Sequence, residues 1–173
     1  DGAWAIVVTS AARARNLRQK PVYMLGAGQA HGHMHISFAR SLTEDSACIE
    51  AGRAAFGMAG AGLQDMDVLG LYDSFTITVL LQLEDLGFCR KGEAGPFVQS
   101  GKLGIGGEFP TNTNGGLLSH AHAGRTANFP HIVEVVQQLR GRAGARQVDN
   151  ARLGLVQFSS HIYSAHCTLV LAN

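Results

Sequence analysis

Residues 71–89 read LYDSFTITVLLQLEDLGFC and follow directly on the apolar residues 68–70, VLG. The short apolar run over residues 68–72, preceded by two aspartates, is typical of a buried strand. Apolar residues then continue over residues 75–86 and stop at Gly87, and glycine is favoured just beyond the C-terminus of a helix. The sequence therefore predicts a strand that leads directly into a helix.

Further strands and helices alternate on both sides of this unit. The apolar patterns predict strands at residues 4–9, 22–26, 152–158 and 167–171, and helices at residues 11–17, 46–59 and 131–140. The stretch 26–35 is rich in Gly and His and is predicted to be a loop. Strands that alternate with helices and end in a strand pair indicate an α/β fold with a layered sheet, rather than a bundle or a sandwich.

Composition narrows the class of protein further. The chain has 173 residues, is 46% hydrophobic and carries 14 Lys and Arg against 13 Asp and Glu, which predicts one compact domain with no basic face for nucleic acid. Its three widely spaced cysteines predict neither a disulfide framework nor a zinc site, and favour a cytoplasmic location. We see no membrane span and no signal peptide. Because the chain starts at Asp1 in a strand pattern, we expect it to begin inside a longer polypeptide.

Three more segments carry a family pattern. They are DGA at residues 1–3, NTNGGLLSHAH at residues 112–122, and QLRG at residues 138–141 followed by RQV at residues 146–148. Together with residues 71–89, they resemble the C-terminal half of the thiolase superfamily, in the branch similar to sterol carrier protein X and bacterial lipid-transfer thiolases. The resemblance implies an α/β/α/β/α fold in the full protein. It assigns residues 1–20 to the end of the first half and a linker, and residues 21–173 to the C-terminal domain.

The resemblance also implies a site. His122 matches the histidine of the family's GHP motif, which activates the nucleophile and donates a hydrogen bond to the thioester oxygen. Asn114, Gly115 and Gly116 match the segment that contacts the substrate. The nucleophilic cysteine belongs to the first half of the family fold, and none of the three cysteines here matches it. The motif's remaining glycines and proline are replaced, which would narrow or reshape the pocket.

Tyr72 is a second catalytic candidate. It stands where many thiolases have an asparagine or histidine that holds a catalytic water or a substrate oxygen, and a phenol can donate a hydrogen bond there or act as an acid in an aldol-type cleavage. The alternative is a strand-end aromatic residue that packs on Phe75, a residue we also expect to contact substrate. Asp73 is expected to cap the following helix.

The turn before the last strand departs from the family. Thiolases carry a second catalytic cysteine in a CxGG turn, whereas residues 157–162 here read QFSSHI. The active site is therefore expected to be altered, which shifts the expected chemistry from ordinary Claisen condensation or thiolysis toward a retro-aldol or another altered reaction. His161 could replace the lost thiol as an acid or base, although a hydrogen-bonded turn histidine is an equal alternative.

His31, His33 and His35 alternate, and on a strand three imidazoles would share one face as metal ligands do. The resemblance instead places them in a loop near the acyl-CoA entrance, so we expect no metal. Gly26-Ala27-Gly28 is weak support for a phosphate contact. No tightly bound cofactor is expected, and a coenzyme A thioester is the expected substrate.

Three functions follow from the resemblance. The first is an acyltransferase or thiolase of lipid or sterol side-chain metabolism, which makes or breaks a carbon–carbon bond beside a thioester. The second is a retro-aldolase, similar to steroid-degrading relatives that work with an OB-fold partner protein. The third is a non-catalytic subunit that binds acyl chains within a heteromer. In each case a homodimer or heteromer is expected to form through the first half.

Overall fold

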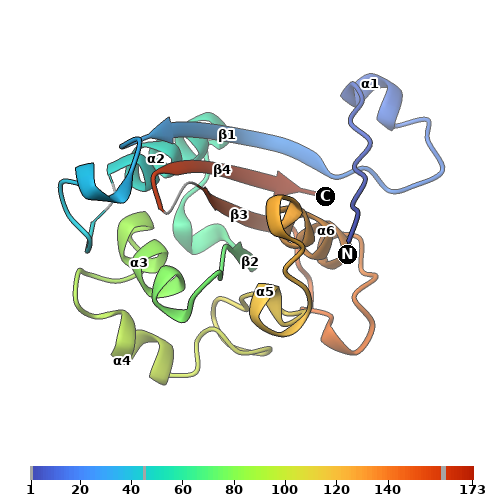
Figure 1. Ribbon diagram of the computed structural model, residues 1–173. Helices are drawn as coiled ribbons and strands as arrows, with labels where there is room; N and C mark the ends of the chain where they lie inside the picture. The colour runs from blue at the N-terminus through green and yellow to red at the C-terminus, as the bar shows by residue number, and fades with distance from the viewer. Residues whose placement is uncertain (1, 45, 161–162) are drawn as a thin grey trace.

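The computed structural model describes residues 2–44, 46–160 and 163–173. Its strands, in chain order, are β1 (Tyr23–His31), β2 (Val68–Leu71), β3 (Leu153–Ser160) and β4 (Ala165–Ala172). Its α-helices are α1 (Ala11–Ala14), α2 (Ser46–Ala59), α3 (Thr76–Leu86), α4 (Ala94–Gln99), α5 (Gly116–Ser119) and α6 (Phe129–Leu139). Within the described residues the strands form one sheet in the order β1-β4-β3-β2 (Figure 1), with β2 and β3 parallel and the other two pairs antiparallel.

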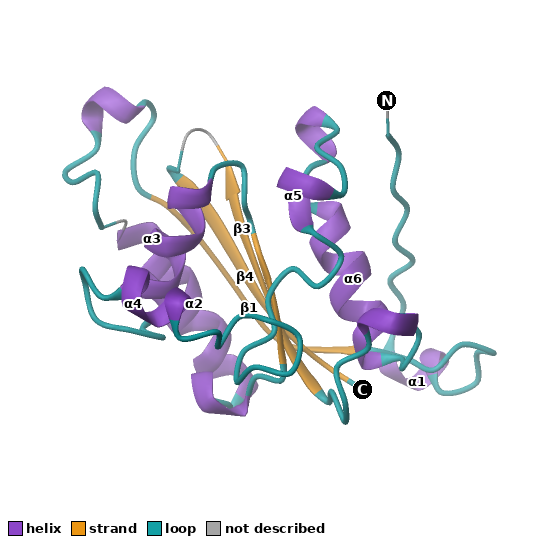
Figure 2. Ribbon diagram, turned by 90° about the horizontal axis from the view of Figure 1, so that it is seen from below, coloured by secondary structure: helices purple, strands orange, loops and turns teal. Residues whose placement is uncertain are grey.

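Helices cover both faces of this sheet. Figure 2 shows α2, α3 and α4 on one side of the sheet and α5 and α6 on the other. The α/β layered fold predicted from the sequence is therefore confirmed, including the strand at β2 that leads into the helix α3. The physical reason is that β2 is buried along all four of its residues, so it needs apolar cover on both faces.

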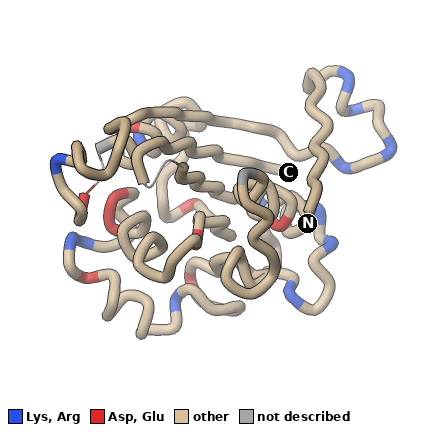
Figure 3. Tube along the Cα trace, in the orientation of Figure 1, with Lys and Arg blue, Asp and Glu red and all other residues tan. Residues whose placement is uncertain are grey.

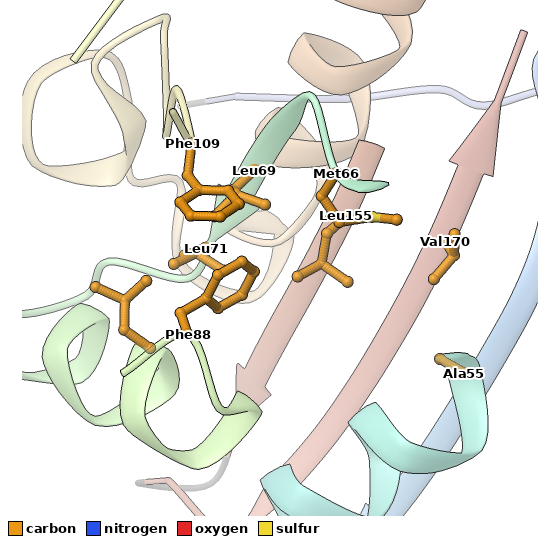
Figure 4. Packing of buried hydrophobic residues seen from close by; sticks show 9 residues of the cluster. Ala55, Met66, Leu69, Leu71, Phe88, Phe109, Leu155 and Val170 are labelled. Carbon is orange, nitrogen blue, oxygen red and sulfur yellow. The ribbon is translucent and has the colours of Figure 1, made fainter. Parts of the chain in front are cut away.

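Buried side chains fill the spaces on both sides of the sheet. On the side of α2 and α3, the ring of Phe88 packs edge-on against Phe109 with centroids 5.1 Å apart. This cluster also contains Ala55, Met66, Leu69, Leu71, Leu155 and Val170, which are labelled with the two phenylalanines in Figure 4. The second cluster lies on the α6 side and consists of Val68, Val135, Leu139, Ala151, Val156 and Leu171.

The predicted loop at residues 26–35 is partly wrong, because β1 continues to His31. Gly26 and Gly28 lie on the strand face that α2 crosses. A Cβ atom at Gly28 would lie 2.0 Å from the carbonyl oxygen of Ala51, and one at Gly26 equally close to that of Ala55. The two glycines let the α2 backbone lie directly on the strand, so their role here is close packing and not a phosphate loop.

The predicted strand at residues 4–9 is also wrong for this chain. No described residue pairs with this segment, and Val7 and Val8 are 90% and 86% exposed. A strand requires a hydrogen-bonded neighbour, which explains the difference. The predicted helix at residues 11–17 is shortened to α1, where the Ser10 hydroxyl accepts a hydrogen bond from the Arg13 amide. The sheet begins at Tyr23, and a domain boundary near residue 20 stays a prediction.

Charged side chains are dispersed over the structure. Figure 3 shows no acidic residue in the loop that contains α1. This loop carries the basic residues Arg13, Arg15, Arg18 and Lys20. Among the described helices, none has the length and apolarity needed to cross a membrane.

The outer edge of β2 is covered by a segment that leads into the NTNGG pattern at residues 112–116. The amide of Leu69 donates to the Pro110 carbonyl at 2.8 Å, and the Asn112 amide donates to the Leu69 carbonyl at 2.9 Å. A bridge between Leu69 and Thr111 completes this short parallel pairing. The pairing places residues 112–116 beside the C-terminal end of β2, where Tyr72 follows.

Candidate active site

Tyr72 leaves β2 with its backbone fixed from two sides. Its amide donates to Gln82 Oε1 and to the Gln157 carbonyl, each at 3.1 Å, and its carbonyl accepts from Gln82 Nε2 at 2.6 Å. Gln82 is fully buried in α3 and so locks the turn between strand and helix. The phenol ring is half-buried and meets the ring of His131 edge-on, with centroids 6.5 Å apart.

The alternative interpretation of Tyr72, packing on Phe75, is not what the structure shows. Phe75 is 68% exposed and precedes α3 as its N-cap residue. Burial raises the pKa of the Tyr72 hydroxyl, and the charge of Asp73 raises it further, against an opposing hydrogen bond from Ser74. The phenol therefore carries its proton at neutral pH and can donate a hydrogen bond.

Asp73 does not cap α3, as the sequence predicted, but caps α5. Its Oδ1 accepts from the Leu117 amide at 2.8 Å and its Oδ2 from the Leu118 amide at 3.4 Å. His131 Nε2 lies 3.3 Å from Oδ1, within ion-pair distance although not aligned for a linear hydrogen bond. Burial alone would raise the pKa of Asp73, but His131 and the two amides outweigh it and hold the pKa below its usual range. Asp73 is thus a buried carboxylate.

The pattern NTNGG, residues 112–116, forms a rigid loop beside Tyr72 that we call the frame. Asn112 Oδ1 accepts from the Leu71 amide at 2.9 Å and its Nδ2 donates to the Leu71 carbonyl at 2.8 Å, so this side chain imitates a neighbouring strand. Asn114 Oδ1 accepts from the Gly116 amide at 2.9 Å. Gly115 and Gly116 have φ values of 97° and 61°, which favour glycine. Contact of Asn114, Gly115 and Gly116 with a substrate stays a prediction.

Glu134 in α6 holds the start of the same frame. Its Oε1 accepts from Thr113 Oγ1 at 2.7 Å, and its Oε2 lies 3.0 Å from Arg146 Nη2. Burial would raise the pKa of Glu134, but its contacts with Arg146, Thr113 and Gln138 hold it below the ordinary value. The helix α6 therefore contacts the frame at Thr113 and, through His131, at the cap of α5.

His122 lies between α5 and the 3₁₀ turn Gly124–Thr126. The residue is exposed, and none of the described residues hydrogen-bonds with its ring. Its neighbour His120 contacts the ring of Trp4, with centroids 6.2 Å apart. His122 is thus open to a ligand, and its catalytic role stays a prediction. His161 lies outside the described residues, so its predicted role is untested.

The region where thiolases carry their second cysteine is a buried polar network. Gln157 is fully buried, its Nε2 lies 3.1 Å from His166 Nδ1 and 3.4 Å from Cys48 Sγ, and its Oε1 accepts from Thr168 Oγ1. Burial raises the pKa of both other thiols, Cys89 and Cys167. Neither of those two cysteines is therefore a thiolate at neutral pH.

Two cavities lie on the α6 side. The larger, about 420 Å³, lies between the start of α6 and the ends of β3 and β4, and Phe129, Ile132, Phe158 and Cys167 are among its lining residues. The smaller, about 200 Å³, is lined in part by Asn114, His120 and Trp4. His31 and His35 hydrogen-bond with their neighbours Gln29 and Ser37, and the described residues contain no group of three ligands for a metal ion.

The structure thus brings Tyr72 and the frame at Asn114–Gly116 together through Asp73. His131 and Glu134, which are 1% and 6% exposed in α6, were not predicted as site residues from the sequence. A signal was present: two ionisable residues, three positions apart, on a helix that otherwise presents an apolar face. Such residues are rarely fully buried without partners.

A four-stranded mixed sheet with helices on both faces, and a site at the end of β2 framed by an NxNGG loop, define a thiolase-type domain. The chain belongs to the thiolase C-terminal-domain-like family, whose sequence pattern it matches over residues 28–173. The resemblance seen in the sequence is thereby confirmed.

The individual relatives include an acyltransferase and aldolases. The chain is 39% identical to an acetyl-CoA acetyltransferase of Methanothermobacter thermautotrophicus over 90% of the chain and 40% of the relative. It is 41% identical to a steroid side-chain-cleaving aldolase of Thermomonospora curvata over 82% of the chain and 36% of the relative. Among solved structures, an Ltp2-ChsH2(DUF35) aldolase superposes with a TM-score of 0.84 at 32% identity, over 94% of the chain and 42% of that structure's chain. The chain therefore spans about two fifths of these relatives.

Proposed function

We propose that this chain forms the C-terminal half of an enzyme that cleaves a carbon–carbon bond beside a coenzyme A thioester by a retro-aldol reaction. The observation that carries the proposal is the protonated, half-buried Tyr72 at the end of β2, held next to the Asn114–Gly116 frame. The similarity to aldolases supports the same reaction. A β-hydroxyacyl-CoA with a fatty or steroid acyl group is the proposed substrate.

The reaction can be written with the residues of this half. The imidazole of His122 takes the proton of the β-hydroxyl group, the bond between the α and β carbons breaks, and its electron pair forms an enolate on the thioester carbonyl. The β carbon becomes a ketone or aldehyde carbonyl. The Tyr72 phenol then protonates the α carbon, and the proton on His122 restores the phenol through solvent. No cysteine nucleophile takes part.

A thiolase reaction is the second candidate, because the relative from Methanothermobacter thermautotrophicus is an acetyltransferase. Against it, Gln157 and Ser159 are buried where that reaction needs an accessible thiol, and Cys89 and Cys167 are protonated. A non-catalytic acyl-binding subunit is the third candidate. The ordered frame around Tyr72 favours an enzyme over that alternative.

The proposed partners follow from the length of the relatives. Residues before this chain would form the first half of the fold and cover the exposed segment at residues 2–10 and the α6 side. We further propose a homodimer or heteromer formed through that half, and an OB-fold protein as a second subunit. Coenzyme A would be bound only as part of the substrate, with no tightly held cofactor, in a cytoplasmic enzyme.

The test uses the intact polypeptide with any required subunit. Cleavage of a β-hydroxyacyl-CoA and of a β-ketoacyl-CoA is measured for the wild type, Tyr72→Phe and His122→Ala, with Tyr23→Phe as the control for loss of a phenol elsewhere. We expect cleavage of the hydroxyacyl substrate only, lowered at least about 100-fold by Tyr72→Phe and by His122→Ala and unchanged by Tyr23→Phe. Cleavage of the ketoacyl substrate with added coenzyme A would establish a thiolase, and no cleavage of either would favour the binding subunit.

A further inference from the structure

His131 is a buried polar residue to which the proposed reaction assigns no proton transfer. It lies in the first turn of α6 and is 1% exposed. Neither ring nitrogen makes an aligned hydrogen bond with the described residues, but Nε2 lies 3.3 Å from Asp73 Oδ1, within ion-pair distance. Burying an imidazole costs free energy when its nitrogens lack partners. The contact with Asp73 is therefore the interaction that accounts for a histidine here rather than an apolar residue.

The backbone is shaped to bring this imidazole to the end of β2. Gly70 lies under the first turn of α6, where a Cβ atom would be 3.1 Å from the Cβ of His131. A larger residue in the strand would push the helix away. The close approach lets one ring contact both residues that follow the strand, the Asp73 carboxylate and the edge-on ring of Tyr72.

Asp73 connects His131 to α5. Its two oxygens accept from the amides of Leu117 and Leu118, which belong to the first turns after the glycines of the frame. A carboxylate that is pulled from one side by His131 and from the other by two amides has one preferred orientation. Because Asp73 follows Tyr72 directly, these contacts link the end of β2 to α5.

A second contact from α6 fixes the opposite end of the frame. Glu134, one turn along the helix, accepts from Thr113 Oγ1, and its own charge is balanced by Arg146. The titratable side chains that contact His131 from the end of β2 are Asp73 and Tyr72. Glu134, on the same helix, contacts Thr113 and Arg146.

We propose that His131 is a positioning residue, which acts through Asp73 to hold the Tyr72 end of β2 against α5. The inference rests on the proposed role of Tyr72 for its effect on catalysis, but its structural part is independent of that role. This positioning role requires a hydrogen-bond donor at position 131 that can point at Asp73.

The experiment compares His131→Leu, which removes the ring nitrogen that faces Asp73, with His131→Gln, whose side-chain amide offers a donor to Asp73. In the intact protein, amide hydrogen exchange at Leu117 and Leu118 is measured by NMR, and kcat and KM are measured for the cleaved substrate. We expect His131→Leu to speed exchange at both amides about tenfold and to lower kcat about tenfold with KM changed less than about twofold. His131→Gln should restore both.

The inference would be overturned if the Leu117 and Leu118 amides exchange at the same rate in His131→Leu and in the wild type. It would also be overturned if His131→Gln is as defective as His131→Leu, because that result would indicate a role in packing alone. If His131→Leu does not fold, Asp73→Asn decides: the ring ¹⁵N resonances of His131 should shift, and unchanged resonances would contradict the contact. If the wild type cleaves no substrate, the proposed function fails while the exchange and resonance data still test the positioning contact.

Discussion

Asp73 and Gly116 lie so close together that neither could change without affecting the other. A Cβ atom at Gly116 would lie 2.1 Å from Asp73 Oδ2, and Gly116 has a φ of 61°. The carboxylate that follows Tyr72 thus occupies the space that a side chain on the frame would need. The two residues are 43 positions apart in the sequence. Their segments form one site because glycine leaves this space free.

Gly116→Ala should destabilise the fold and displace Asp73. We compare it with Gly124→Ala, because Gly124 has a similar φ of 58° but no atom within 4 Å of its would-be Cβ. Backbone strain costs about 1–2 kcal/mol at either position, so the excess at Gly116 reports the clash with the carboxylate. We expect Gly116→Ala to lower the free energy of unfolding in urea by at least about 2 kcal/mol more than Gly124→Ala. Equal losses would show that the contact with Asp73 is unimportant.

The stabilisation by Asp73 should depend on pH. The pKa of this carboxyl is lowered in the folded protein, so its contribution is present above the pKa of the unfolded chain, near 4, and is lost as the pH falls through the folded pKa. Asp73→Asn should therefore cost about 1.5 kcal/mol at pH 7, and the difference from the wild type should shrink below about pH 4.

Unfolding in urea at several pH values measures this dependence. Asp149→Asn is the control, since Asp149 is exposed and its replacement should change stability little at any pH. A cost of Asp73→Asn that stays constant from pH 7 to about pH 3 would contradict the carboxylate as the stabilising form.

Gly28→Ala should separate β1 from α2. The added Cβ would lie 2.0 Å from the Ala51 carbonyl oxygen, and a backbone atom cannot move aside as a side chain can. We expect a loss of about 3 kcal/mol or more in the free energy of unfolding. Gly57→Ala, in α2 with open space around it, should instead stabilise the helix by up to about 1 kcal/mol. If the two substitutions have similar effects, the close packing of β1 on α2 is not needed for stability.

The segment at residues 4–9 should become a strand only in the full polypeptide. Val7 and Val8 are almost fully exposed in this chain, which is unfavourable for β-branched apolar residues. We expect their amides to exchange within seconds in the isolated chain and at least about 100-fold more slowly in the full protein, as for a paired strand. Fast exchange in both would contradict the assignment of residues 1–20 to the first half.

The helices and strands with strong apolar patterns could be predicted from the sequence. The helix α2 begins and ends at the predicted residues, and β2, α3, β3 and β4 lie where the periodicity places them. The family motifs were also readable, because NTNGG and LEDLGFC are specific in type and order. The errors at β1 and at residues 4–9 share one cause. Whether an extended segment becomes a strand depends on a neighbour far away in the chain, which local pattern does not contain.

The sequence by itself thus determined the fold class, the family and the residue types at the site, since periodicity, glycine positions and motif order are properties of the chain alone. Only the tertiary structure decided which side chains act together. In the structure, Asp73 caps α5 and not the helix that follows it. The ring of Tyr72 contacts His131, where the sequence had suggested Phe75. Thr113 hydrogen-bonds with Glu134. The physical reason is that such contacts join residues brought together by packing of α6 on the sheet, and their partners are selected by distance in space and not by spacing in the sequence.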